Sequence, residues 1–180
     1  MTSAGPGEEP LYVRDPEAWR EKLAEGNRTQ PRKRVAAKVL LRDGSDRLLL
    51  VDPTYKPLWD LPGGMAEENE APHDAALREL QEELGLRIEL GRLLCVDWVA
   101  PRDPWDDLLM FFFDGGVLPE DIADGLAVAD DELCSLGWFH LGQVPDLLRD
   151  DVWARTQHAI QAAKDKTTVY LQQGRSFPYV

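Results

Sequence analysis

Three glutamates, Glu79, Glu82 and Glu83, stand close together near the middle of the chain. If residues 72–84 form a helix, this spacing places the three carboxylates within one arc of ~100°. Like charges at i, i+3 and i, i+4 repel, and Glu82 and Glu83 would also lie at the negative end of the helix dipole. A solvated acidic face is the alternative. Because both the repulsion and the helix dipole disfavour this arrangement, we expect that a bound cation stabilises it.

The donor atoms available indicate the kind of cation. The 3 histidines and 2 cysteines are scattered, so the usual zinc spacings are absent, as is the EF-hand calcium pattern. Oxygen donors favour a hard ion, Mg²⁺ or Mn²⁺, which usually completes its shell with substrate phosphates. No GxSxG motif or P-loop is present. The sequence therefore predicts a phosphate-bearing substrate that is attacked by water.

The elements that must position these glutamates follow from the pattern of apolar residues. Helices are predicted from Asp15-Pro16 to Gly26, over residues 72–84 with Gly85 as the C-terminal stop, and over residues 152–163. Strands are predicted over residues 35–41, 48–51, 93–99, 108–113 and 136–141. Strands interrupted by one helix and closed by another indicate a mixed α/β domain.

Composition limits the classes of function. The chain has 180 residues and a net charge of −13, of which −6 lies in residues 67–83 and −6 in residues 120–132. The acidic balance argues against general nucleic-acid binding. No apolar run is long enough for a membrane span, and the first ten residues do not resemble a secretory signal. We expect a cytoplasmic protein in which Cys95 and Cys134 are buried, reduced thiols.

The segment from Gly64 to Leu86 is similar to the Nudix box of Nudix hydrolases, including MutT-like members. Every fixed position of that pattern is filled, by Gly64, Glu70, Arg78, Glu79, Leu80, Glu82, Glu83, Gly85 and Leu86. The preceding residues 59–63, WDLPG, also resemble the lead-in common in these enzymes. Asn69 departs from the Gly that many members have there.

This resemblance implies a fold and an activity. The expected fold class is α/β, a Nudix-type α/β/α sandwich with a central mixed β-sheet. The expected activity is Mg²⁺- or Mn²⁺-dependent hydrolysis of a phosphoanhydride bond in a nucleoside diphosphate linked to another group. Glu79, Glu82 and Glu83 would be metal ligands together with the Gly64 carbonyl. Glu79 and Glu82 would also be catalytic with Arg78, which would pair with Glu70.

Several further assignments rest on position alone. The general base, or an additional metal ligand, is a box glutamate or one of Glu67, Asp130, Asp131 and Glu132, and the last three lie in an acidic segment that could also be a solvated loop. Trp59, Trp105 and Asp106 are candidate substrate contacts, although packing in the core or at its rim is the commoner role of a tryptophan. Arg78 could also form an i, i+4 pair with Asp74 or Glu82.

The sequence also predicts how the chain is divided and what it binds. We expect an N-terminal extension over residues 1–34 with a short helix and a basic linker over residues 28–34, a Nudix core over residues 35–145, and a C-terminal helix and tail over residues 146–180 that pack on it. The partner is a small nucleotide: ADP-ribose, which Pro101 weakly favours, a nucleoside triphosphate or a dinucleoside polyphosphate. A non-catalytic nucleotide-sensing module is the alternative function. Residues 111–113, FFF, put rings on both strand faces, and a helix or a second subunit, as in a homodimer, could cover the second face.

Overall fold

A computed structural model describes residues 9–176. The chain divides into two units between Arg32 and Lys33. In the first unit, α1 (Leu11–Arg14) precedes α2 (Pro16–Thr29). The Asp15 carboxylate caps α2 by accepting from the Ala18 N–H at 2.9 Å, as its position before Pro16 predicts.

The predicted end of this first helix at Gly26 is wrong, because α2 continues to Thr29. A glycine inside a helix costs only about 1 kcal/mol, and two contacts support the last turn. Arg28 pairs with Glu25, and the Thr29 hydroxyl donates to the Glu25 carbonyl at 3.0 Å. Residues 28 and 29 of the predicted basic linker are therefore helical.

The second unit is built on a mixed sheet. Its strands are β1 (Arg34–Arg42), β2 (Leu48–Pro53), β3 (Leu93–Val99), β4 (Leu108–Val117), β5 (Leu133–Phe139), β6 (Val169–Gln172) and β7 (Arg175–Ser176), in the spatial order β5-β2-β1-β4-β3-β6-β7. The pairs β1–β4 and β3–β6 are parallel, and the other neighbours are antiparallel. The mixed sheet confirms the predicted fold class.

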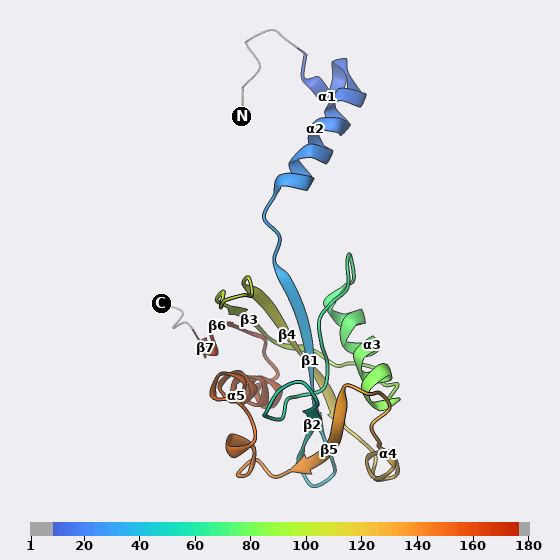
Figure 1. The fold of residues 1–180 in the computed structure, drawn as a ribbon, viewed down its shortest axis with the longest axis vertical. Helices are drawn as coiled ribbons and strands as arrows, with labels where there is room; N and C mark the ends of the chain where they lie inside the picture. The colour runs from blue at the N-terminus through green and yellow to red at the C-terminus, as the bar shows by residue number, and fades with distance from the viewer. Residues whose placement is uncertain (1–8, 177–180) are drawn as a thin grey trace. The chain divides into compact units, whose positions relative to one another are not determined.

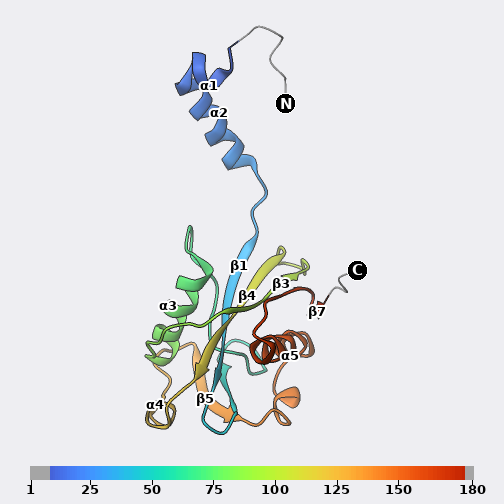
Figure 2. The same ribbon diagram turned by 180° about the vertical axis from the view of Figure 1, so that it is seen from behind.

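Two helices cover opposite faces of this sheet, α3 (Pro72–Leu84) and α5 (Asp150–Asp165), as Figures 1 and 2 show. Successive strand residues point to opposite faces, so each strand contributes to two cores. The α3 side contains Ala37, Val39, Leu49, Val51, Ala76 and Leu80, and the α5 side contains Leu40, Leu48, Leu50, Phe112, Ala159 and Ala162. Phe111 and Phe113 pack on the α3 side and Phe112 on the α5 side, so helices cover both faces at these rings.

Some short elements are not predicted by the sequence pattern. They are α1, β6, β7, the 3-10 turn η1 (Val144–Asp146) and α4 (Glu120–Gly125). The acidic segment is therefore partly helical rather than a simple loop. β5 begins three residues earlier than predicted and ends at Phe139. Cys95 is buried, as predicted, but Cys134 is exposed, because it alternates with buried Leu133 on the edge strand β5.

The start of β1 is paired with a loop rather than with β2, whose pairing to β1 is confined to Arg42 and Leu48. The Ala37 N–H donates to the Gly64 carbonyl at 2.9 Å, the Val39 N–H to the Pro62 carbonyl at 3.0 Å, and the Ala66 N–H to the Val35 carbonyl at 2.9 Å. These bonds fix the glycine loop to the centre of the sheet. Among residues 9–176, no helix has the length and hydropathy that crossing a membrane requires.

Candidate active site

Helix α3 presents two different faces. Ala75, Ala76, Leu80 and Leu84 are buried against the sheet. The helix ends as predicted at Gly85, whose φ of 63° is left-handed and whose N–H donates to the Gln81 carbonyl at 3.0 Å. The predicted bounds, residues 72–84, match the structure, so the three glutamates do occupy one side of a helix.

Two glycines allow the loop before the helix to lie against it. Gly63 has a φ of 115°, and a Cβ on it would overlap the Ala37 carbonyl oxygen. A Cβ on Gly64 would lie 2.5 Å from Cδ of Glu79. The Glu79 carboxylate therefore fills the space that any side chain at position 64 would need, and the two glycines are required for this close approach.

Arg78 connects the loop to the helix. Its guanidinium donates to Glu70 through Nε at 2.9 Å and Nη2 at 3.1 Å, and to the Met65 carbonyl at 2.9 Å. It also donates to Glu79 at 3.0 Å and to Glu82 at 2.7 Å. The structure thus contains the predicted pair with Glu70 and the i, i+4 pair with Glu82. Arg78 partly offsets the repulsion that the sequence attributes to the clustered carboxylates.

Glu83 differs from its neighbours because it is buried at 9% exposure. Burial is the main reason that its pKa rises to about 7, since the charged form loses hydration. Its Oε2 accepts from the Gly63 N–H at 2.8 Å, which ties the helix to the glycine loop. Burial also raises the pKa of Glu79, against the opposing effect of Arg78.

Lys38 and Asp60 are site residues that the sequence reasoning missed. The Lys38 ammonium donates to the Leu61 carbonyl at 3.0 Å and to the Gly63 carbonyl, and it lies 3.3 Å from the Asp60 carboxylate. Burial alone would lower the pKa of Lys38, but Asp60 and Glu83 outweigh it and raise that pKa. A signal was available, because Lys38 is a charge within the otherwise apolar run 35–41.

The donor set fits a hard divalent cation. Glu79, Glu82 and Glu83 offer carboxylate oxygens, and the Gly64 carbonyl, which accepts from Ala37, keeps a second lone pair. Within residues 9–176, however, no group of three or more His, Cys, Asp or Glu side chains is arranged to hold an ion as it stands. Arg78 holds Glu79 and Glu82, so binding an ion would require these carboxylates to turn.

Comparison with known proteins identifies the family. The NUDIX domain model matches residues 32–162, which is well over half of the chain. The chain belongs to the NUDIX domain family. The resemblance of residues 64–86 to the Nudix box is therefore confirmed. Nudix hydrolases generally need a divalent metal ion.

Two curated relatives match parts of the chain. A Bacillus subtilis protein whose name refers to 8-oxo-dGTP diphosphatase activity is 34% identical over 108 residues, which cover 59% of this chain and 66% of that protein. Human diphosphoinositol polyphosphate phosphohydrolase 3-alpha is 35% identical over 98 residues, which cover 54% of this chain and 59% of that protein. The chain spans less than two thirds of the length of either relative.

A solved structure supports the same fold. The MutT NUDIX hydrolase from Burkholderia pseudomallei is 27% identical to this chain, with a TM-score of 0.58 over 73% of this chain and 98% of that one. The predicted Nudix-type α/β/α sandwich with a central mixed sheet is confirmed.

The other predicted base candidates lie at different places relative to the Nudix box. Asp130 is close enough to Glu83 for its charge to contribute to the raised pKa of that residue, and the Ala129 N–H donates to the Glu83 carbonyl at 2.9 Å. Asp131 and Glu132 are exposed, and so is Glu67. Glu67 lies within the Nudix box, and its backbone N–H donates to the Glu70 carboxylate at 2.8 Å. In the described residues, the side chains of Asp131 and Glu132 have no hydrogen bond or ion pair to a box glutamate. Of the acidic segment, the structure therefore brings Asp130 near Glu83.

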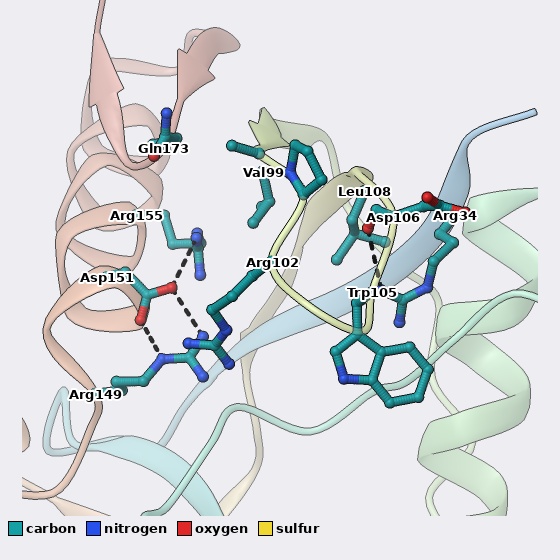
Figure 3. A pocket seen from close by; sticks show the side chains of 12 residues that line it. Arg34, Val99, Arg102, Trp105, Asp106, Leu108, Arg149, Asp151, Arg155 and Gln173 are labelled. Atoms are coloured by element: carbon teal, nitrogen blue, oxygen red, sulfur yellow. Dashed lines mark hydrogen bonds and ion pairs between the residues drawn. The ribbon is translucent and has the colours of Figure 1, made fainter.

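The predicted substrate contacts line two cavities, and neither lining includes a described residue of the Nudix box. Trp59 packs edge-on against Phe139, with ring centroids 4.9 Å apart, and also lines a cavity of about 190 Å³. Trp105 is 58% exposed and lines a larger cavity of about 460 Å³ with Asp106. Trp59 thus packs against Phe139 and also lines the smaller cavity. Trp105 is mainly exposed and lines the larger cavity. Four arginines also line this larger cavity, which we call the arginine cavity (Figure 3): Arg34, Arg102, Arg149 and Arg155.

Proposed function

We propose that this chain hydrolyses a phosphoanhydride bond in a nucleoside diphosphate linked to another group, with water as the nucleophile and Mg²⁺ or Mn²⁺ as the cofactor. The observation that carries the proposal is the placement of Glu79, Glu82 and Glu83 on one side of α3, against the Gly63–Gly64 loop. The names of the two curated relatives, a diphosphatase and a phosphohydrolase, support the reaction class.

The proposal assigns tasks to the box residues. Glu79, Glu82, Glu83 and the Gly64 carbonyl would hold the ion, which would supply Lewis-acid chemistry for the attack of water on phosphorus. Arg78 keeps the loop and the helix in register through Glu70 and the Met65 carbonyl. Glu82, whose side chain is 54% exposed, would have a second task, accepting the proton from water.

A substrate panel with product identification tests the proposal. ADP-ribose, dinucleoside polyphosphates, and ordinary and oxidised nucleoside triphosphates would each be incubated with Mg²⁺ or Mn²⁺, and the products separated by ion-exchange chromatography. Glu82→Gln should lower kcat/KM by about 100-fold or more. This variant should perturb the fold little, because the Glu82 side chain is exposed. Within the described residues, its contact is with Arg78.

The matched control is Asp74→Asn, which removes a carboxylate from the same helix. The Asp74 side chain is 71% exposed and interacts with His73, so its activity should equal that of the wild type. If wild type turns over no member of the panel faster than Glu82→Gln, the proposal is wrong. Tight binding of an intact nucleotide without product would instead favour the nucleotide-sensing module, in which Arg78 keeps Glu79 and Glu82 occupied.

A further inference from the structure

Lys38 is a charged side chain in the buried part of β1. It is 9% exposed, the other residues from 35 to 41 are apolar, and its ammonium lies against the glycine loop, residues 61–64. Burying an ammonium group costs free energy even when it is paired, and an apolar side chain of similar size often serves stability equally well. A lysine at this position therefore indicates a task beyond packing.

Strand β1 holds the glycine loop in two ways. Its backbone N–H groups bind two of the loop carbonyls, those of Pro62 and Gly64. The Lys38 ammonium binds the other two, that of Leu61 at 3.0 Å and that of Gly63. All four carbonyls of the loop are therefore held by the same short stretch of β1, and half of them depend on one side chain.

The peptide group between Gly63 and Gly64 depends on Lys38 in particular. In the described part of the chain, its carbonyl is bound by Lys38 and its N–H has no hydrogen bond. The peptide groups on either side are held by backbone bonds from Val39 and Ala37. Glycine on both sides leaves the central peptide group with little steric restriction. Its orientation is therefore set by the lysine.

This orientation matters because Gly64 lies against a box glutamate. A Cβ on Gly64 would be 2.5 Å from Cδ of Glu79, and the Gly64 carbonyl is one of the expected ligands of the ion. The carbonyl and the N–H of a trans peptide group point in opposite directions. Rotation of the peptide group would turn the Gly63 carbonyl away from Lys38 and change φ of Gly64, the angle on which the direction of the Gly64 carbonyl depends.

Asp60 keeps the lysine in place. Its carboxylate is 3.3 Å from the Lys38 ammonium and accepts from the Leu61 N–H at 2.8 Å, and its backbone is paired with Val51 of β2. Lys56 also pairs with Asp60, but within the described residues it has no hydrogen bond to the glycine loop. The two lysines thus share one acid, and Lys38 is the one that binds the loop.

The charge of Lys38 opposes a bound ion. Lys38 is close enough to Glu79 and Glu83 for its charge to counteract the rise of their pKa values. An ammonium group at such a distance repels a divalent cation held by the same carboxylates. Any contribution of Lys38 to the metal site must therefore come from the carbonyls that it binds.

We propose that Lys38 is a positioning residue of the metal site, which holds the peptide group between Gly63 and Gly64 in the orientation that lets the Gly64 carbonyl bind the ion. Lys38 acts through the glycine loop and contacts neither the ion nor the substrate. The inference rests on the proposed function, because Mg²⁺ or Mn²⁺ is part of it.

Calorimetric titration with Mn²⁺ tests this role in the absence of substrate. Lys38→Met keeps most of the length of the side chain and removes the ammonium. It should weaken Mn²⁺ binding about tenfold or more, as is usual when a residue that orients a metal ligand is lost. The loss of a nearby positive charge would by itself tighten binding, so the sign of the change separates the two effects. In metal-free ¹H–¹⁵N spectra, the Gly64 amide signal should move and broaden.

Lys56→Met is the matched control, because it removes the other lysine that pairs with Asp60. It should bind Mn²⁺ no more weakly than wild type and leave the Gly64 signal unchanged. If Lys38→Met does not fold, the double variant Lys38→Met/Asp60→Asn takes its place. It keeps the net charge, leaves no buried acid without its lysine, and retains an oxygen that can accept from the Leu61 N–H.

Three results would overturn the proposal. They are Mn²⁺ binding as tight as that of wild type in Lys38→Met or in the double variant, equal weakening in Lys56→Met, and a Gly64 amide signal that keeps its position and width without Lys38. A wild-type chain that binds no Mn²⁺ would instead overturn the proposed function, and the metal role of Lys38 with it. A chain that binds Mn²⁺ as described and hydrolyses nothing would overturn only the proposed activity.

Discussion

The Nudix box and the arginine cavity are both clusters of like charge, negative in the box and positive in the cavity. In the box, three glutamates and Glu70 are arranged near two bases: Arg78 bonds Glu70, Glu79 and Glu82, and Lys38 lies near Glu83. In the cavity, four arginines are arranged near two aspartates, and Asp151 bonds two of them. In each region one central side chain is shared by several groups of opposite charge, and at least one charge is left without full compensation.

The two regions differ in how they are anchored. Within residues 63–83 the box is held by contacts between a loop and the helix that follows it, and backbone bonds to β1 fix that loop to the sheet. The cavity is anchored by Arg155 and Asp97, which are 1% and 0% exposed and lie 58 residues apart in sequence. Asp97 also accepts from the Gly174 N–H at 3.1 Å. The cavity therefore depends on a buried pair that joins β3, α5 and the turn before β7.

The largest effect on stability is expected at this buried anchor. Asp97→Ala removes the buried partner of the Arg155 guanidinium, which keeps only its 3.2 Å contact with Asp151, and also removes the acceptor of the Gly174 N–H. The free energy of unfolding should fall by about 3–5 kcal/mol, as for other broken buried pairs, measured by urea denaturation. Adding Arg155→Met to the same chain should recover much of this loss, because the unpaired charge is then absent. A loss below about 1 kcal/mol would show that the two regions are not anchored differently.

The same contrast explains what the sequence could predict. Gly64, Glu79, Glu82 and Glu83 lie within a single loop and helix, so helical geometry alone places the carboxylates on one side, and Gly85 marks the end of the helix. The buried strands and their alternation are equally local, which is why β3 and most of β1 and β2 follow from the apolar pattern.

The arginine cavity could not be predicted in this way. Arg34, Arg102, Arg149 and Arg155 come from three separate parts of the chain, and only the register of the sheet and the docking of α5 bring them together. No local period marks such residues. β6 and β7 are too short to produce a pattern, and Arg78 bonds carboxylates that the sequence reasoning assigns to a cation.

A second prediction concerns the uncompensated charge in the Nudix box. The pKa of Glu83 is about 7, above its usual value, so the folded protein holds this proton more tightly than the unfolded chain does. The corresponding stability is fully present below about pH 4.5 and is lost as the pH rises through about 7. In EDTA, the free energy of unfolding should therefore fall by on the order of 2 kcal/mol across this window.

Glu83→Gln should flatten this dependence, because the amide cannot ionise and its oxygen can still accept from the Gly63 N–H. The measurement is a series of urea unfolding curves between pH 4.5 and 8, with Glu89→Gln, a glutamate outside the Nudix box, as the control. Adding Mg²⁺ at pH 8 should restore stability to wild type more than to Glu83→Gln. A wild-type profile as flat as that of the variant would contradict the placement of a poorly compensated carboxylate at Glu83.

The smallest effect is expected at Asp151, the shared acid of the arginine cavity. Partial burial alone would raise its pKa, but Arg149 and Arg155 outweigh this and lower it. Because the side chain is 38% exposed, water replaces much of what is lost, and Asp151→Asn should cost less than about 1 kcal/mol in urea denaturation. Asp97 and Asp151 bond the same arginine, so a loss at Asp151 as large as that at Asp97 would mean that the cavity arginines form one structural network. A small loss would instead show that the contact between Asp151 and Arg149 contributes little to stability.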